Sequence, residues 1–464
     1  MTIATALVYL VAAVLFIVGL KFLSSPAGAR RGNQVAAAGM LLAVGWTVVV
    51  LRDQFTVAGL VICVLGVLIG GVAGTVGARR VQMTAMPQMV ALFNGVGGGA
   101  AALVAVAELL KLNGARPEFQ TGFPSIFAIV IGGISFAGSA VAFAKLQELM
   151  TGRPITYPGQ QIVNGLLAAA ILALAVLVLA VTGSAVVFTI LLLLALVLGV
   201  AFVLPIGGAD MPVVISMLNA FTGLAVAASG FVVDNFALIV AGTLVGASGT
   251  LLTKLMSDAM GRSLANVLFG AFGQVQVGAG GGAAADGRSV RAGSSDDIGT
   301  MLAYSRSVII VPGYGLAVAQ AQHAVRELAD LLEKRGVEVN YAIHPVAGRM
   351  PGHMNVLLAE ANVPYEQLKE MDEINDDFKR ADVALVVGAN DVVNPAARNS
   401  PGSPIYGMPI LNVDQAHNVV FLKRSMRPGF AGIDNELLYE PQTIMLFGDA
   451  KESLTKLVSA VKAA

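Results

Sequence analysis

The first 262 residues of this 464-residue chain contain nine apolar segments, each long enough for a helix that crosses a membrane. A spanning helix needs about 20 mainly apolar residues. The boundary between the sixth and seventh segments depends on the short turn signal Thr182-Gly183-Ser184. This part of the chain predicts a polytopic α-helical membrane domain with spans near 4–23, 34–51, 55–76, 87–110, 122–146, 162–182, 185–204, 211–233 and 235–256.

Charged residues divide the chain into two parts. Residues 1–262 contain 12 Lys and Arg and 7 Asp and Glu, whereas residues 263–464 contain 17 and 22. Because soluble domains carry about 25% charged residues, the first composition suits lipid and the second suits water. An ordinary soluble enzyme is therefore excluded for the whole chain. We expect a membrane domain over 1–262, a linker over 263–299 and a soluble domain over 300–464.

The cations between the spans predict the orientation in the membrane. One set of alternate loops, with the stretch after the last span, holds nine cations, and the other set holds three. Cytoplasmic loops carry the excess of Lys and Arg, so we expect the N-terminus outside and the soluble domain in the cytoplasm. The first set comprises Lys21, Arg30, Arg31, Arg79, Arg80, Lys145, Arg153, Lys254 and Arg262, and the second comprises Arg52, Lys111 and Arg116.

Four polar residues in or beside the spans are candidates for a proton path. Asn94 lies in the fourth span, Ser139 in the fifth and Asn219 in the eighth, which Asp210 opens. Polar groups are costly in lipid unless they face protein or water. For Asn94 and Asn219, interhelical hydrogen bonding is an equal alternative. Asp210 can instead cap the next helix, where Pro212 is tolerated in the first turn.

Glycines spaced by four residues recur in the third, fourth and ninth spans. This spacing predicts close approach of helix backbones in lipid, and a pore lined by backbone is the alternative. The pairs and triplet concerned are Gly66, Gly70 and Gly74, then Gly95 and Gly99, then Gly242 and Gly246.

The remaining composition excludes several classes of function. Cys63 is the one cysteine, so neither a disulfide framework nor a thiolate metal site is expected. The soluble part is acidic overall and lacks a large basic stripe, which argues against nucleic acid. No arginine ladder and no potassium-filter sequence occur in the spans.

Residues 274–297 are rich in Gly, Ala and Ser and contain few large apolar side chains. A segment of this composition cannot bury a core, so it predicts a flexible tether. Coupling between the two parts is then expected to act through docking surfaces.

From about residue 300, short β-branched runs alternate with helical stretches. This alternation is typical of a doubly wound parallel sheet, so we expect a Rossmann-like α/β domain after the membrane domain. The candidate strands are 307–311, 337–343, 383–387, 409–413, 418–423 and 443–447, and the candidate helices are 317–335, 354–361, 365–380 and 450–461.

A glycine motif follows the first predicted strand and leads into a helix. Gly313, Gly315 and Val318 stand at the three positions of a GxGxxG-like dinucleotide fingerprint, with Val in the third. The first glycine would allow a tight turn, and the second would let a phosphate approach backbone N–H groups.

Two further segments favour NADP(H) over NAD(H). An NAD site places an acid near the end of the second strand, but residues 341–349 contain none. Lys423, Arg424 and Ser425 end the fifth strand and offer two cations and a hydroxyl, which suit a 2′-phosphate. A solvated charged pair is the alternative for these cations.

Several long stretches also carry a resemblance to a known family. They begin at Ile206 (IGGADMPVV), Val311 (VPGYGLAVAQAQ), His344 (HPVAGRMPGHMNVLLAEA), Glu370 (EMDEINDDF), Gly388 (GANDVVNPAA), Lys423 (KRSM) and Leu446 (LFGDAK). Over almost its full length, the chain resembles the β subunit of the proton-translocating NAD(P) transhydrogenase, and the count of nine spans agrees with that subunit.

The resemblance implies that the soluble domain binds NADP(H) in reversed orientation, with the 2′-phosphate at Lys423 to Ser425. The loop 427–434 would be a lid over the nucleotide. Beside Gly313, Gly315 and Val318, the implied contacts are Tyr314, Val346, Ala347, Gly348, Arg349, Met350, Pro351, Gly388, Ala389, Asn390, Asp391, Val392, Gly407, Met408, Lys423, Arg424, Ser425, Met426, Arg427, Pro428, Gly429, Phe430, Asp449 and Ala450.

The chain departs from the family's pattern at two positions. Asn94 stands where many bacterial members carry a membrane histidine, and Phe430 stands where relatives often carry Tyr. Because an amide is not protonated near neutral pH, the proton carrier must be Asp210 through ordered water or a residue of a partner. We favour a partner histidine, with Asn94, Ser139 and Asn219 holding the water path.

The resemblance implies hydride transfer from NADH to NADP⁺, driven by inward proton movement. The cofactors carry this chemistry and need no catalytic side chain on this chain. One fingerprint accounts for one nucleotide, so NAD(H) is expected on an α subunit, in a dimer of αβ units in the bacterial inner membrane. The alternative is a channel or transporter gated by a dinucleotide-sensing domain.

Overall fold

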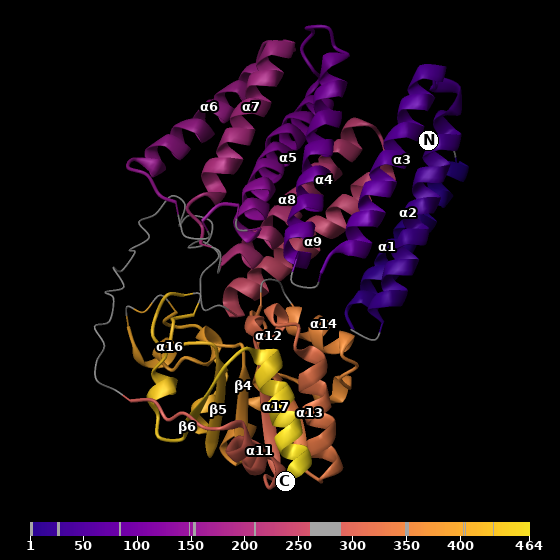
Figure 1. Ribbon diagram of the computed structural model, residues 1–464. Helices are drawn as coiled ribbons and strands as arrows, with labels where there is room; N and C mark the ends of the chain where they lie inside the picture. Colours follow the sequence, from indigo (N-terminus) through magenta and orange to yellow (C-terminus); the bar gives the residue numbers. More distant parts are fainter. Residues whose placement is uncertain are drawn as a thin grey trace. The chain divides into compact units, whose positions relative to one another are not determined.

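Figure 1 shows a computed structural model of the chain. The described residues are 3–25, 28–82, 85–147, 149–151, 155–207, 210–259, 289–348, 352–401, 403, 405–429 and 431–464. They belong to two compact units, one that contains the residues up to Thr253 and one that contains those from 289 onward. Each unit is described by itself. Most of the predicted linker, 263–288, lies outside the described residues.

Within the described residues, nine helices are long and apolar enough to cross a membrane, which confirms the predicted count. The turn around Gly183 separates the sixth from the seventh, as the sequence predicts. The helices are α1 Ile3–Leu23, α2 Ala29–Leu51, α3 Val57–Arg80, α4 Met86–Leu110, α5 Phe119–Leu146, α6 Gln160–Ala180, α7 Ala185–Val203, α8 Met211–Val232 and α9 Phe236–Ala259.

Helices α5 and α8 form the buried centre of the membrane unit, and α4 and α7 pack beside α5. Small residues allow the close approach. A Cβ on Gly242 of α9 would lie 2.3 Å from the backbone nitrogen of Ala227 in α8, and one on Gly99 would lie 2.9 Å from the Phe136 ring. The packing interpretation of the glycine spacing is therefore confirmed for α4 and α9.

Helix α3 is different, because none of its residues is buried in the described part of the chain. A Cβ on Gly66, Gly70 or Gly74 would meet no described atom within 4 Å. The glycine triplet thus packs against no other described residue of this chain.

The second unit contains a six-stranded parallel sheet in the order β3-β2-β1-β4-β5-β6, which confirms the expected doubly wound class. The order reverses between β1 and β4, which are hydrogen-bonded neighbours. The central strand β4 is buried along its whole length, as expected for a parallel strand covered on both faces. The strands are β1 Ser307–Pro312, β2 Glu338–Ile343, β3 Leu368–Glu370, β4 Val383–Val387, β5 Asn418–Lys423 and β6 Thr443–Phe447.

Helices cover the sheet on both faces. On one face α13 and α17 pack side by side, with α11 against α17 (Figure 1). On the other, Phe378 and Leu437 join Val386 and Phe421 of the sheet in one buried cluster. The helices of this unit are α11 Ser295–Ala303, α12 Tyr314–Val318, α13 Gln322–Lys334, α14 His353–Glu360, α15 Met371–Ile374, α16 Ala396–Asn399 and α17 Ala450–Ala463.

Three predicted elements are wrong. The helix over 317–335 is two helices, because Gln320 adopts a left-handed backbone conformation between α12 and α13. The helix over 365–380 contains the edge strand β3, which pairs with β2. Residues 409–413 form no strand, because side chains hold this segment: Asn375 donates to the Ile410 carbonyl and accepts from the Asn412 amide.

The folded unit also begins earlier than residue 300. The amide of Gly293 donates to the Met445 carbonyl at 3.0 Å, and α11 packs against α17. Residues 289–299, predicted to be linker, therefore add to the sheet edge and to its helical layer.

Candidate functional site

The predicted nucleotide-binding residues follow the carboxyl ends of the strands. Ligands of doubly wound sheets bind at this edge, next to the point where the strand order reverses. Residues 313–318 follow β1, 346–348 follow β2, 388–392 follow β4, 423–429 end and follow β5, and 449–450 follow β6. Among the described binding candidates, Gly407 and Met408 lie farther from a strand end, in the crossover between β4 and β5.

The loops after β1 and β4 are packed backbone against backbone. The amide of Gly313 donates to the Val387 carbonyl and that of Gly315 to the Gly388 carbonyl, each at 2.9 Å. A Cβ on Gly313 would lie 2.3 Å from the Cα of Ala389. The motif glycines therefore serve a contact between two loops that side chains would prevent.

This contact occupies one of the backbone amides near the predicted phosphate position. The Gly315 N–H is engaged by the Gly388 carbonyl, and α12 is a helix of only five residues. Val318, the third position of the fingerprint, is exposed at the end of α12 instead of packing against the sheet. The fingerprint thus shapes the switch point without presenting that amide to a phosphate.

Asn390 connects three parts of this edge. Its Oδ1 accepts a hydrogen bond from the Lys423 ammonium at 3.1 Å, and its Nδ2 donates to Asp391 at 3.0 Å. Its carbonyl accepts from the side chain of Asn435 at 3.1 Å. The loop after β4 is therefore joined to the end of β5 and to the segment that follows the predicted lid.

Lys423 is half-buried beside two carboxylates. Burial lowers the pKa of Lys423, and the charges of Asp434 and Asp391 oppose that shift. The next residues, Arg424 and Ser425, are exposed. The end of β5 thus offers one half-buried and one exposed cation, together with a hydroxyl.

The predicted lid is anchored to the loop after β4. The amide of Ala431 donates to a carboxylate oxygen of Asp391 at 2.9 Å, and a Cβ on Gly429 would lie 2.3 Å from the Asn390 amide nitrogen. Asn394 donates to the Asp434 carbonyl at 2.9 Å. Phe430, like Arg349, Met350 and Pro351, lies outside the described residues.

His344 joins two other predicted segments and is almost completely buried. Its Nδ1 accepts from the Val346 amide at 3.2 Å, so Nε2 carries the proton that is donated to the Pro409 carbonyl at 2.8 Å. Burial lowers the pKa of His344 to about 4, and the bond to Pro409 opposes this shift. The neutral ring holds the loop after β2 next to the Gly407 and Met408 segment.

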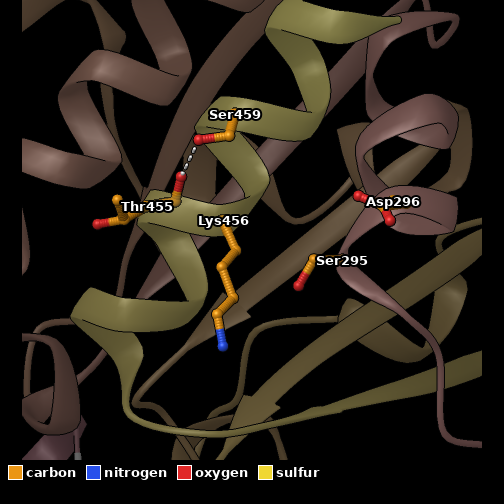
Figure 2. Close-up of a pocket in the computed structure, with 5 residues that line it drawn as sticks. All are labelled: Ser295, Asp296, Thr455, Lys456 and Ser459. Atoms are coloured by element: carbon orange, nitrogen blue, oxygen red, sulfur yellow. Dashed lines mark hydrogen bonds between the residues drawn. The ribbon is translucent and has the colours of Figure 1, made fainter.

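Two other features of the soluble unit involve helix α17. The carboxylate of Asp449 accepts from the Lys451 amide at 3.0 Å and caps α17. Figure 2 shows a shallow, open depression between α11 and α17. None of the residues that line it is a predicted binding residue: Ser295, Asp296, Thr455, Lys456 and Ser459.

In the membrane unit, a polar cluster joins α4, α5 and α8. The side-chain amide of Asn94 donates to Ser139 at 2.9 Å and to Ser135 at 3.3 Å. Ser135 lies 2.6 Å from the Thr222 hydroxyl and donates to the Leu218 carbonyl at 2.8 Å. The sequence analysis missed Ser135 and Thr222, although Ser135 lies one helical turn before Ser139.

The other two predicted path residues lie elsewhere. Asp210 occupies the N-cap position of α8, but its side chain makes no capping hydrogen bond within the described residues. Asn219 is exposed on α8, and no hydrogen bond joins it to the cluster among the described residues. The structure thus brings Asn94 and Ser139 together, and it places neither Asp210 nor Asn219 with them.

The sequence matches the family model of the NAD(P) transhydrogenase beta subunit over residues 5–460. The chain belongs to this family. It is 51% identical over 464 residues to the NAD(P) transhydrogenase subunit beta of Rhodospirillum rubrum, a match that covers 98% of this chain and 99% of the relative. A second relative of the same name, from a designated strain of that species, shows the same identity and coverage.

Membership in the transhydrogenase beta-subunit family confirms the resemblance seen in the sequence. It makes the chain a subunit of an oxidoreductase that uses nicotinamide dinucleotides. The nine span-capable helices and the parallel-sheet unit agree with a membrane protein of this family.

Proposed function

We propose that this chain binds NADP(H) at the carboxyl edge of its sheet and forms most of the proton path of a proton-translocating transhydrogenase. An α subunit supplies NAD(H), and inward proton movement drives hydride transfer from NADH to NADP⁺. The observation that carries the proposal is the convergence of the loops after β1, β4 and β5 around Asn390 and Lys423, at the sheet's switch point.

The cations at the end of β5 support NADP(H) as the nucleotide. Arg424 is exposed, and Lys423 is half-buried beside it. We expect both side chains to contact a 2′-phosphate that approaches from solvent. NADP⁺ supplies the hydride acceptor when bound. The residues of this chain orient it and, through the segment 427–434, exclude water.

Changing the cation pair tests the nucleotide assignment. In the full-length chain, Lys423→Ala/Arg424→Ala is expected to weaken NADP⁺ binding about 100-fold, because two charge-assisted hydrogen bonds are lost. NAD⁺ binding, which lacks the phosphate, should stay weak and unchanged. Titration calorimetry in detergent measures both affinities.

A matched control lies on the same unit. Lys379 and Arg380 form the same dipeptide, but they make exposed ion pairs with Asp376 and Asp377. Lys379→Ala/Arg380→Ala should leave NADP⁺ affinity unchanged. Equal binding of NADP⁺ and NAD⁺ by the unaltered chain would refute the assignment and favour a membrane protein gated by a dinucleotide sensor.

For the membrane unit, we propose that the cluster of Asn94, Ser135, Ser139 and Thr222 holds the water path, with Asp210 at its cytoplasmic end. Asn219 is exposed on a spanning helix, where lipid contact would be costly. A helix of the α subunit is therefore expected to cover it and to bring the protonatable group, a histidine. The other proposed features are the dimer of αβ units, the inner bacterial membrane and an external N-terminus.

Removing one hydroxyl from the cluster tests this path. Ser135→Ala deletes the contacts to Asn94, Thr222 and the Leu218 carbonyl, so the proton-coupled rate in vesicles is expected to fall about tenfold. Ser125→Ala is the control, because Ser125 is buried on the same helix but bonds only its own turn at Thr121 among the described contacts. Equal rates for the two variants would remove the cluster from the proton path.

A further inference from the structure

Lys145 is a buried cation in the last turn of α5. Its side chain is almost completely buried, with 3% of the residue exposed. Its ammonium donates to the Leu204 carbonyl at 2.5 Å and to the Ile206 carbonyl at 2.7 Å, with the Val203 carbonyl at 3.4 Å. Lys145, which the sequence places among the cytoplasmic loop cations, is therefore buried and hydrogen-bonded within the protein.

The partners of Lys145 explain how this charge is accommodated. All three are carbonyls at or just past the end of α7, and none of these described partners is a carboxylate. The C-terminus of a helix carries partial negative charge and unpaired carbonyls, which a cation stabilises. The three carbonyls provide one hydrogen-bond acceptor for each of the three N–H groups of the buried ammonium.

The bonds of Lys145 hold the connection between α7 and α8. The Leu204 carbonyl also accepts from the Ile155 amide at 3.1 Å, and the Ile206 amide donates back to Val203 at 3.1 Å. Four residues beyond Ile206 the chain reaches Asp210, whose amide donates to the Gly207 carbonyl. Lys145 thus binds residues 203–206, which lie shortly before Asp210 and α8 in the chain.

Helix α5 therefore contacts α8 and the segment before it at two points along its own length. Near its middle, Ser135 binds the Leu218 carbonyl and Thr222. At its end, Lys145 binds the segment that leads into α8. A shift of α5 relative to α7 would change the polar cluster and the placement of Asp210 together.

We propose that Lys145 is a positioning residue for the proton path, which acts by holding the α7–α8 connection so that Asp210 stays at the end of the path. The inference rests on the proposed proton translocation. Lys145 itself carries no proton in this scheme. Its ammonium organises three carbonyls, and its effect on translocation passes through Asp210.

A double-mutant cycle tests the proposal in the assembled enzyme in vesicles. Lys145→Met keeps the length of the side chain and removes the donors, so the proton-coupled rate is expected to fall about tenfold, with KM for NADP⁺ unchanged. Lys145→Arg, which retains charge and donors, should restore most of the rate. In an Asp210→Asn background, Lys145→Met should change the remaining rate by less than about twofold.

The controls separate the possible failures. Lys111→Met removes an exposed lysine that pairs with Glu108 and should leave the rate unchanged. Additive effects of Lys145→Met and Asp210→Asn would overturn the positioning role and leave the proposed path intact. An Asp210→Asn enzyme with the full coupled rate would overturn both. If Lys145→Met does not accumulate in the membrane, Lys145→Gln enters the same cycle with the same criteria.

Discussion

Gly388→Ala is expected to destabilise the soluble unit by about 3–5 kcal/mol and to reduce NADP⁺ affinity by at least about 100-fold. Gly388 has a φ of +73°, which a side chain disfavours, and an added Cβ would lie 2.3 Å from the Leu316 backbone nitrogen. Backbone cannot rotate away as a flexible side chain can, so the loops after β1 and β4 must separate. Thermal unfolding and a nucleotide titration of the full-length chain measure the two effects.

A second glycine separates the cost of backbone strain from the cost of the steric contact. Gly336 also has a positive φ, +84°, but a Cβ there would meet no described atom within 4 Å. Gly336→Ala is expected to cost only about 1–2 kcal/mol and to leave NADP⁺ affinity unchanged. Equal effects of the two substitutions would show that the contact between the loops contributes nothing to the site.

His344→Leu is the second substitution with a large expected effect. It leaves the Pro409 carbonyl and the Val346 amide without their buried partner, at a cost of about 2–5 kcal/mol. NADP⁺ affinity should fall with it, because the loop after β2 loses its attachment to the Gly407 segment. His344→Gln, which keeps a donor and an acceptor, should restore part of both.

The same histidine predicts a dependence of stability on pH. Its folded pKa of about 4 lies below the ordinary value of 6.5, so folding favours the neutral ring. The stability that His344 contributes is complete above pH 6.5 and is lost as the pH falls from 6.5 through about 4. The shift corresponds to about 3 kcal/mol.

The difference in unfolding free energy between the wild type and His344→Gln measures this contribution across pH 4–7. Subtracting the two free energies cancels the contributions of the carboxylates that titrate in the same pH range. His323→Gln, at an exposed position on α13, is the control for the change from histidine to glutamine and should leave the unfolding free energy near the wild-type value. A His344→Gln curve parallel to the wild type would contradict the prediction.

Elements whose pattern is decided by their own residues were predictable. The nine spans follow from runs of apolar side chains, and β4, β5 and β6 match the β-branched runs that predict them. The three strands are buried along most of their length, and the spans are apolar enough to face lipid, so composition alone indicates both environments.

Elements decided by distant contacts were not predictable. β3 has the sequence Leu368-Lys369-Glu370, which is no strand signal, and it exists because β2 offers a free edge. The segment 409–413 has a strand pattern, but Asn375 and His344 hold it in another conformation. No sequence signal between α12 and α13 predicts the left-handed backbone conformation of Gln320.

The candidate sites divide in the same way. The sequence placed the candidate nucleotide-binding residues after strand ends, because a parallel sheet brings such ends to one edge. It did not reveal that Asn390 would link them, or that Gly315 would give its amide to Gly388. In the membrane, Ser135 and Lys145 acquire their roles from carbonyls on other helices, which no local pattern shows.

The paired backbone bonds between the loops after β1 and β4 have a dynamic consequence. Segments that share hydrogen bonds open as one cooperative unit, so Gly313, Gly315 and Gly388 are expected to have a common opening free energy. A fluctuation that begins at the β4 loop therefore reaches the start of α12 without passing through the sheet. The switch point is therefore expected to open as a single hinge formed by two chain segments.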